Sequence, residues 1–358
     1  MNKIDYLYLA MLHSIWITHK KLHLIFSNKK NYKEFYEWLN HKILLKYWFL
    51  SNQAFLILDN KKNINIENIE KKLIEREVKI VTFFDTLYPE AFKNIPNSPF
   101  LFYLRWQINN SPKIAVVWSR KISSYWENVV KNIIPDLSNY FTIVSGWAAW
   151  CDSFAHIESI NTWNKTLSII WTWIDLDYPI KNKKLYDNIV INWWWVISIF
   201  PVWEVWNPYN FPVRNELVAW ISNWVLVIEA WEKSWTLITA NLALDLWKDL
   251  FVVPWEIFKK NSIWCNNLIK NWCAKLITCT QDILEEYNIL SKNIKNTQIK
   301  FSDKIEEDIY NMLLLEDLSI NELSKKIELD IQTVLFKIWF MEINNYVKKS
   351  SWGKYCVC

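Results

Sequence analysis

Glycine is almost absent from this chain of 358 residues, which has 2 glycines and 26 tryptophans. A soluble protein of this length ordinarily carries about 25 glycines and only a few tryptophans. Glycine is the residue that reaches positive φ angles without steric cost, so a chain that lacks it lacks the usual means of making tight turns. The shortage of glycine and the excess of tryptophan are also nearly equal in size.

Tryptophan stands where turn sequences normally place glycine. It follows asparagine at Trp193, Trp224 and Trp272, and it follows serine at Trp235 and Trp352. Asn-Gly and Ser-Gly are common turn dipeptides, whereas an indole side chain has no such preference. We therefore hypothesise that the gene comes from a lineage that reads the codon UGA as glycine, and that most of these tryptophans are glycines in the natural protein. UGG codons at most of these positions would contradict the hypothesis.

Two further absences bear on the compartment. The six cysteines form no CxxC pair, which favours the reduced, buried thiols of a cytosolic protein, with a metal site of Cys265, Cys273 and Cys279 as the alternative. No apolar run reaches the roughly 18 residues of a membrane-spanning helix, and the first residues do not resemble a signal peptide. We expect a cytoplasmic protein that does not contact a membrane.

Arginine is scarce as well. The formal net charge is only +4, so any contact with nucleic acid would rest on a local patch rather than on the field of the whole molecule. The 41 basic residues include only the arginines at positions 76, 105, 120 and 214. Because arginine offers a bidentate geometry that lysine cannot supply, an arginine kept in a lysine-rich chain is a candidate phosphate ligand.

The apolar pattern predicts three domains. Residues 1–75 have helix-like spacing and predict a small helical domain, with a helix-hairpin-helix-like contact to DNA as one option. Prolines make the stretch from about 80 to 112 an irregular, extended segment, and a polar stretch near 288–302 predicts a linker. Residues 303–358 predict three helices and a hairpin, the order of a winged helix, and Ser319 with Glu322 forms a capping box at the second helix.

The middle of the chain, residues 80–287, alternates short apolar runs with helical stretches. The runs show no clean alternation of polar and apolar residues, which is typical of strands buried on both faces of a parallel sheet. They are Ile114–Val117, Phe141–Val144, Thr166–Ile170, Val196–Ile199, Val225–Ile228 and Leu250–Val253. Helices are expected near 125–137, 152–161, 213–222 and 236–247. This order predicts an α/β fold with a Rossmann-like, doubly wound parallel sheet.

Three loops follow predicted strand ends, where open α/β sheets bind their ligands. The first contains Ser119 and Arg120 and precedes a helix whose free N–H groups could hold a phosphate; a surface ion pair is the alternative. The second contains Gly146 and predicts an anion-binding nest of backbone N–H groups. Asp152 and His156 lie one helical turn apart just beyond it, which fits a metal or catalytic pair, but we favour a helix cap and a packed histidine.

The third region combines Arg214 and Asn215 with the turn that contains Lys233 and Ser234, another anion-binding arrangement. Here the alternative is a structural ion pair between Glu229 and Arg214. No GxGxxG motif, no lysine after a glycine loop and no nucleophile beside a base stands out. We therefore expect a binding protein rather than an enzyme, without cofactor or metal.

With glycine at the tryptophan positions, residues 114–126 become IAVVGSRKISSYG and residues 143–156 become IVSGGAAGCDSFAH. Further motifs follow in order at 211–215, 229–230, 233–240, 253–255 and 264–266. This succession resembles the DNA-processing protein A (DprA/Smf) family over residues 80 to 285, and the flanking segments resemble domains that the family often carries.

The resemblance implies a homodimer that binds incoming single-stranded DNA during natural transformation, protects it and helps load the RecA recombinase. It implies a phosphate pocket and a basic rim, which together comprise Ser119, Arg120, Ser123, Gly146, Arg214, Asn215, Lys233 and Ser234. Such binding would be sensitive to salt and nearly blind to sequence. Indoles at positions 118, 147 and 150 would fill this pocket, so the function implied by the resemblance depends on glycine there.

Two other functions are open. A Rossmann-like phosphoribohydrolase would need a glutamate beside a PGGxGT-type loop, whereas Glu229 precedes a turn that contains lysine. A winged-helix regulator would read duplex DNA with the helix near residues 330–345. That helix contains Gln332 and Lys337 but no arginine, which favours an auxiliary role.

Overall fold

The computed structural model describes residues 3–27, 31–106, 108, 110–118, 124–147, 151–174, 195–203, 210–230, 234, 236–259, 262–289, 301–344, 346–349 and 353–357. The chain forms two compact units, Met1–Ile289 and Leu290–Cys358. Most of the predicted linker near 288–302 lies outside the described residues, so the predicted domain bounds stay predictions.

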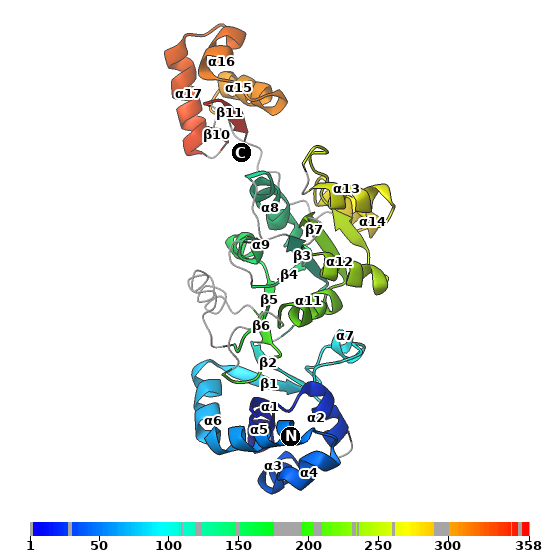
Figure 1. Ribbon diagram of the computed structural model, residues 1–358. Helices are drawn as coiled ribbons and strands as arrows, with labels where there is room; N and C mark the ends of the chain where they lie inside the picture. The colour runs from blue at the N-terminus through cyan, green and yellow to red at the C-terminus, as the bar shows by residue number, and fades with distance from the viewer. Residues whose placement is uncertain are drawn as a thin grey trace. The chain divides into compact units, whose positions relative to one another are not determined.

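Helices form the first part of unit 1. They are α1 (Lys3–Ser14), α2 (His19–Phe26), α3 (Tyr32–Trp38), α4 (His41–Lys46), α5 (Ser51–Asn63) and α6 (Ile66–Glu75). Figure 1 shows them gathered beside strands β1 (Val78–Thr82) and β2 (Leu101–Arg105). Leu12, Phe26 and Leu73 share one apolar core with Val78 and Tyr103, so the structure sets no boundary between the first two predicted domains.

One sheet organises the rest of unit 1. Its other strands are β3 (Lys113–Trp118), β4 (Thr142–Ser145), β5 (Thr166–Ile170), β6 (Trp195–Ser198), β7 (Trp224–Glu229), β8 (Leu250–Val252) and β9 (Lys275–Leu276). The order across the sheet is β1-β2-β6-β5-β4-β3-β7-β8-β9. All neighbours from β6 to β9 are parallel, which confirms the doubly wound, Rossmann-like sheet.

Strands β1 and β2 were not expected, because the prolines predicted an irregular segment over residues 80–112. The two strands run antiparallel to each other from Val78↔Arg105 to Thr82↔Leu101, and β2 is also antiparallel to β6. The prolines that suggested irregular structure lie between the two strands, around the short helix α7 (Glu90–Lys93). The prolines therefore shape the connection and leave the strands intact.

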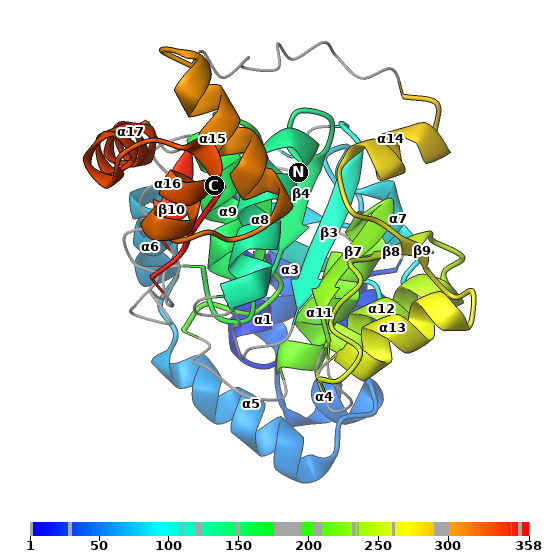
Figure 2. The same cartoon turned by 90° about the horizontal axis from the view of Figure 1, so that it is seen from above.

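Helices cover both faces of the parallel strands, as Figure 2 shows for β3 and β7. One face packs on α8 (Ser124–Leu137), α9 (Cys151–Asn161) and α14 (Gln281–Glu286). The other packs on α11 (Asn210–Ile221), α12 (Thr236–Asp245) and α13 (Ile263–Lys270). Successive residues of β3 alternate between the two cores: Ile114 and Val116 face α8, whereas Ala115 and Val117 face α11.

Unit 2 contains three helices followed by a hairpin, in the order that the sequence predicted. The elements are α15 (Lys304–Leu315), α16 (Ile320–Ile327), α17 (Ile331–Ile343), β10 (Val347–Lys349) and β11 (Tyr355–Val357). The predicted capping box is confirmed: Ser319 Oγ accepts from the Glu322 N–H, and the Glu322 carboxylate accepts from the Ser319 N–H. The two strands pair antiparallel.

Tryptophan occupies most of the left-handed backbone positions. Among the described residues, 7 of the 10 non-glycine residues with positive φ are tryptophans. Five of these lie two residues after the last residue of a helix: Trp16, Trp48, Trp163, Trp247 and Trp272. At each one the tryptophan N–H bonds the carbonyl three residues back, and the next N–H bonds the carbonyl five residues back.

That pair of hydrogen bonds defines the Schellman motif, in which the left-handed residue is usually glycine. A side chain at such an angle costs about 1–2 kcal/mol. Five helix ends thus have a glycine backbone conformation and a tryptophan side chain, which is what the glycine hypothesis expects. Within the described part of the chain, no helix is long and apolar enough to cross a bilayer.

Candidate nucleic-acid interface

The order of the sheet reverses between β3 and β7. Strands β4, β5 and β6 follow on one side of β3, while β7 and β8 lie on the other. Because these strands are parallel, their carboxyl ends share one edge, and open α/β sheets bind ligands at the crevice where the order reverses. The predicted loops after β3, β4 and β7 all leave this edge.

Gly146 lies at the start of the loop after β4, against an arginine. A Cβ atom at this position would overlap the guanidinium of Arg214 and the carboxylate of Asp152. Glycine is therefore required here for space, because the guanidinium packs directly on the backbone. The Gly146 carbonyl is also held from beneath, since Ser168 Oγ donates to it at 3.3 Å and a ring nitrogen of His156 bonds it at 3.0 Å.

Arg214 is buried, with 1% of its surface exposed, although the family resemblance implied a place in the phosphate pocket and its basic rim. Its Nη1 donates to the Ile169 carbonyl at 2.9 Å and lies 3.5 Å from the Asp152 carboxylate, and its Nε donates to Asn215 Oδ1 at 2.9 Å. The guanidinium also lies 4.7 Å from the centre of the Trp171 ring. Arg214 therefore ties α11 to β5 and α9 beneath the loop.

His156 packs under the same loop, in the structural role that the sequence favoured. One ring nitrogen bonds Thr166 Oγ1 at 2.6 Å and the other bonds the Gly146 carbonyl. The pKa of His156 is lowered from 6.5 to about 4, mainly by burial, and the nearby charge of Arg214 acts in the same direction. The histidine is therefore neutral at physiological pH, with both ring nitrogens occupied, and it supports the loop rather than transferring protons.

Indoles crowd the interior beneath the loops. Trp118 stacks on Trp126 with their ring centres 5.3 Å apart, and Trp147 lies against His156. Among the described residues, Nε1 of Trp118, Trp126 and Trp171 has no hydrogen-bond partner. A buried donor without a partner costs about 1–3 kcal/mol. Glycine would remove these unpaired donors and open space beside the loops.

Comparison with known proteins shows which family this chain belongs to. Residues 79–288 match the sequence model of the family described as DNA recombination-mediator protein A. The chain is 35% identical over 208 residues to the DNA processing protein DprA of Streptococcus pneumoniae, covering 58% of this chain and 73% of that protein. The chain belongs to this family. Protein Smf of Borreliella burgdorferi is 28% identical over 279 residues, covering 77% of this chain and 86% of that protein.

Two solved structures of family members share the fold. The X-ray structure of DNA processing protein A from Streptococcus pneumoniae has a TM-score of 0.67 and 28% identity, covering 80% of this chain and 99% of that one. The Helicobacter pylori protein, whose structure concerns its single-stranded-DNA-binding mode, has a TM-score of 0.52 and 22% identity, covering 60% of this chain and 97% of that one.

The predicted site residues fall into three groups in this DNA recombination-mediator protein A fold. Gly146, Arg214 and Asn215 are brought together beneath the loop after β4. Ser234 lies in the loop after β7, and its Oγ has no hydrogen-bond partner among the described residues. Ser119, Arg120, Ser123 and Lys233 lie outside the described residues. The carboxylate that meets Arg214 is that of Asp152, whereas the alternative from the sequence was Glu229.

Tyr125 and the loop between β8 and α13 received no role from the sequence pattern. The Tyr125 hydroxyl donates to the Pro254 carbonyl at 2.9 Å, which joins the start of α8 to the end of β8. The backbone of Trp255 and the amide of Asn266 exchange two hydrogen bonds across the same loop. The signal that was available is an aromatic residue, Phe258, next to lysines in a turn that leaves the carboxyl edge.

The three cysteines of the alternative metal site differ in their surroundings. Cys265 is buried, and burial raises the pKa of its thiol to about 12, whereas Cys273 and Cys279 are exposed. Over the described ranges, no three side chains of His, Cys, Asp or Glu form a group that could hold a metal ion. The alternative of a metal site at these cysteines therefore gains no support.

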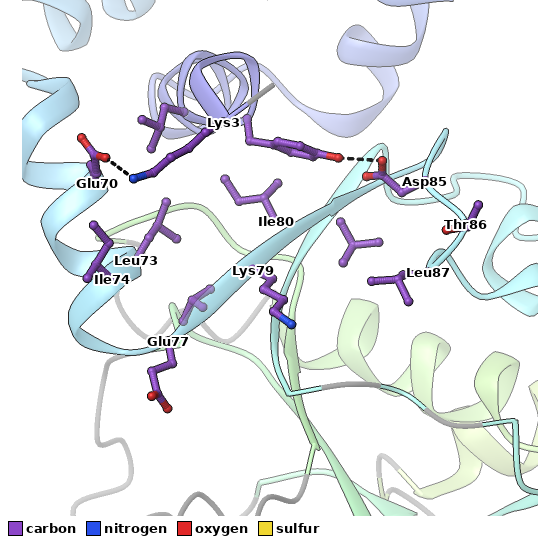
Figure 3. A pocket seen from close by; sticks show the side chains of 14 residues that line it. Lys3, Glu70, Leu73, Ile74, Glu77, Lys79, Ile80, Asp85, Thr86 and Leu87 are labelled. Carbon is purple, nitrogen blue, oxygen red and sulfur yellow. Dashed lines mark hydrogen bonds and ion pairs between the residues drawn. The ribbon is translucent and has the colours of Figure 1, made fainter. Parts of the chain in front are cut away.

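A groove of about 690 Å³ lies away from this edge, beside the outermost strand β1. Figure 3 shows its apolar lining of Leu73, Ile74 and Ile80 between α1, α6 and β1. Lys3 pairs with Glu70 at 2.7 Å, and the Tyr6 hydroxyl donates to Asp85 at 2.7 Å. With an apolar lining and charges of both signs, this groove is a poor match for a phosphate backbone, and we do not assign DNA to it.

Proposed function

We propose that this protein binds single-stranded DNA along the carboxyl edge of β3, β4 and β7, holding the strand by its phosphates. We further propose that it acts in the cytoplasm as a homodimer, protects the strand and helps to load RecA during natural transformation. The observation that carries the proposal is that the loops matching the family motifs leave the point where the order of the sheet reverses. Homologues named as DNA processing proteins support it.

Gly146, the first residue after β4, is fixed before any ligand arrives. The Arg214 guanidinium packs on the backbone of Gly146, and His156 and Ser168 bond the Gly146 carbonyl. Preorganised backbone N–H groups lose little entropy on binding, so such a loop suits an anion. Arg214 is buried beneath it, so we assign it a positioning role and leave direct phosphate contact to Arg120 and Lys233.

Binding rather than catalysis is the better match to the described side chains. His156 has both ring nitrogens occupied and a lowered pKa, and Asp152 faces the guanidinium of Arg214. Neither group is placed to transfer a proton to a ligand at the edge. Robust nucleotide hydrolysis by the purified protein would contradict this and favour the phosphoribohydrolase.

In unit 2, helix α17 presents few groups that could bind duplex DNA. Lys337, the cation of α17, pairs with Asp303 at 2.6 Å and Glu306 at 3.2 Å. The exposed face of α17 instead carries Leu335 and Phe336. Readers of duplex DNA need free donors and positive charge on the helix that enters the groove, so we propose an auxiliary role for this unit.

Arg120→Ala tests the proposal in a chain that carries glycine at the disputed tryptophan positions. We expect weaker binding of a thymidine oligonucleotide and a slope of log affinity against log salt smaller by about 0.7, the value for one phosphate that is no longer neutralised on a single strand. Arg76→Ala, at the end of α6, is the matched control and should change neither quantity. Unchanged affinity and slope in Arg120→Ala would remove this loop from the binding site.

A further inference from the structure

The loop between β8 and α13 places large apolar side chains in solvent at the proposed DNA-binding edge. Phe258 is 94% exposed and Ile257 is 73% exposed. Single exposed apolar residues are common on protein surfaces. Two adjacent ones in one loop, on the edge where the proposed DNA-binding loops emerge, point to a ligand with an apolar face.

The described part of this loop, residues 253–259 and 262, is tethered by hydrogen bonds. Ser262 Oγ donates to the carbonyls of Glu256 and Lys259, and the Lys259 and Ser262 N–H groups bond the carbonyls of Glu256 and Lys259 at 3.2 and 3.1 Å. The amide of Asn266 fixes the start of the loop through two hydrogen bonds with Trp255. Phe258 is therefore flanked by backbone that hydrogen bonds fix at Glu256 and Lys259, which reduces the entropy lost when a flat group stacks on its ring.

The loop is also joined to the phosphate-binding region. Tyr125 lies two residues after Ser123, and its hydroxyl donates to the Pro254 carbonyl. Since β8 is parallel to β7 and β7 to β3, the loop after β8 emerges on the same edge as the loops after β3 and β7. A single strand of DNA bound there through its phosphates would have its bases within reach of this loop.

The contacts of the Trp255 indole indicate which side chains a flat ligand in its place would contact. It lies parallel to the Tyr125 ring, with a centre-to-centre distance of 6.0 Å and an angle of 9°. The ammonium group of Lys259 lies 5.6 Å from the centre of the same indole. An indole is close in size and shape to a purine, so glycine at position 255 would leave a slot between an aromatic face and a cation.

We propose that Tyr125 and Phe258 form a base-stacking platform for single-stranded DNA beside the phosphate-binding loops. The inference rests on the proposed function, to which it adds recognition of the bases. Stacking on aromatic rings tolerates every base, because each base has a π face. The platform would therefore add affinity and preference for unpaired strands without adding sequence specificity.

The test compares a thymidine oligonucleotide with an abasic oligonucleotide of equal length, on the full chain with glycine at the disputed positions. The parent protein should prefer the oligonucleotide with bases. Phe258→Leu keeps apolar bulk but removes the ring, and we expect it to lower that preference by roughly 5-fold or more, the lower end of the range for one stacked base. Phe258→Tyr is the matched control and should retain the preference.

The salt dependence separates this inference from the proposed function. Phe258→Leu should leave the slope of log affinity against log salt unchanged, because the phosphates remain bound as before. If the parent binds neither oligonucleotide, the proposed function itself is wrong. If Phe258→Leu shows the parent's preference for bases, or changes only the oligomeric state, binding to DNA stands and the stacking platform is wrong.

Discussion

At the residue scale, the tryptophans at helix ends have bulky side chains on a backbone conformation that favours glycine. Trp247 is 96% exposed and Trp272 is 95% exposed, and both have positive φ angles at the ends of helices. An exposed indole gains nothing from burial there, while its Cβ atom strains the backbone. Glycine at these positions would adopt the positive φ angle without strain and would expose no indole to solvent.

Trp247→Gly is therefore expected to stabilise the protein by about 1 kcal/mol, because it relieves the left-handed angle after α12. Trp339→Gly, in the exposed interior of α17, is the matched control and should destabilise unit 2 by roughly 1 kcal/mol, the usual cost of glycine within a helix. Urea denaturation of each variant measures both effects. A loss of stability in Trp247→Gly would contradict the glycine hypothesis at that position.

The two glycines of the chain are needed for different reasons. Gly146→Ala should destabilise unit 1 by about 1–3 kcal/mol or more, since the new methyl group meets Arg214 and Asp152. Gly353 has a φ of +76°, and no atom lies within 4 Å of the place that a methyl group would take, so Gly353→Ala should cost only the backbone strain, about 1 kcal/mol. Thermal unfolding measures each effect.

Equal binding of DNA by Gly146→Ala and the parent would show that the loop after β4 is not part of the interface.

At the scale of elements, the loop after β4 depends on a neutral histidine in α9. Burial lowers the pKa of His156 to about 4, below its ordinary value of 6.5. Between these two values the unfolded chain binds a proton that the folded chain does not bind. The free energy of unfolding therefore falls as the pH is lowered through this range, by up to about 1.4 kcal/mol per pH unit for this residue.

His156→Gln should reduce that dependence on pH, because glutamine can form hydrogen bonds without titrating. We expect the plot of unfolding free energy against pH, measured between about pH 6.5 and pH 4 by urea denaturation, to become less steep by up to about 1.4 kcal/mol per pH unit. Burial also lowers the pKa of His19 to about 4, so part of the slope should remain. A slope equal to that of the parent would show that His156 does not couple to folding.

The elements also show what the sequence could predict. The parallel strands were recognisable because burial on both faces produces continuous apolar runs such as Ile114–Val117. Strands β1 and β2 were missed because prolines between them dominated the local pattern. The burial of Arg214 could not be predicted, since its partners, Asp152 and the Ile169 carbonyl, are 62 and 45 residues away in sequence and meet it only once the sheet has formed.

At the scale of the whole molecule, the two units carry different surfaces. The carboxyl edge of the sheet in unit 1 has the loops that match the family motifs, while the exposed face of α17 in unit 2 is apolar. The family match itself ends at residue 288, just before unit 2 begins. The proposed interface with DNA therefore lies within unit 1 alone.

A chain that ends after Ile289 should bind a thymidine oligonucleotide within about 2-fold of the full chain and with the same salt slope, because each phosphate that the protein no longer neutralised would change that slope by about 0.7. Fluorescence anisotropy at several salt concentrations measures both quantities. A much weaker affinity with a smaller slope would place phosphate contacts in unit 2 and revive its role as a DNA reader.

The helix ends marked by tryptophan also bear on how this protein can be made. The first of them, Trp16, has a φ of 71° two residues after the last residue of α1. If its codon is UGA, a laboratory host that treats UGA as a stop signal would release a peptide ending at Ile15, before the second helix is translated. Expression would then require a synthetic gene in which every such codon is replaced by an ordinary glycine codon.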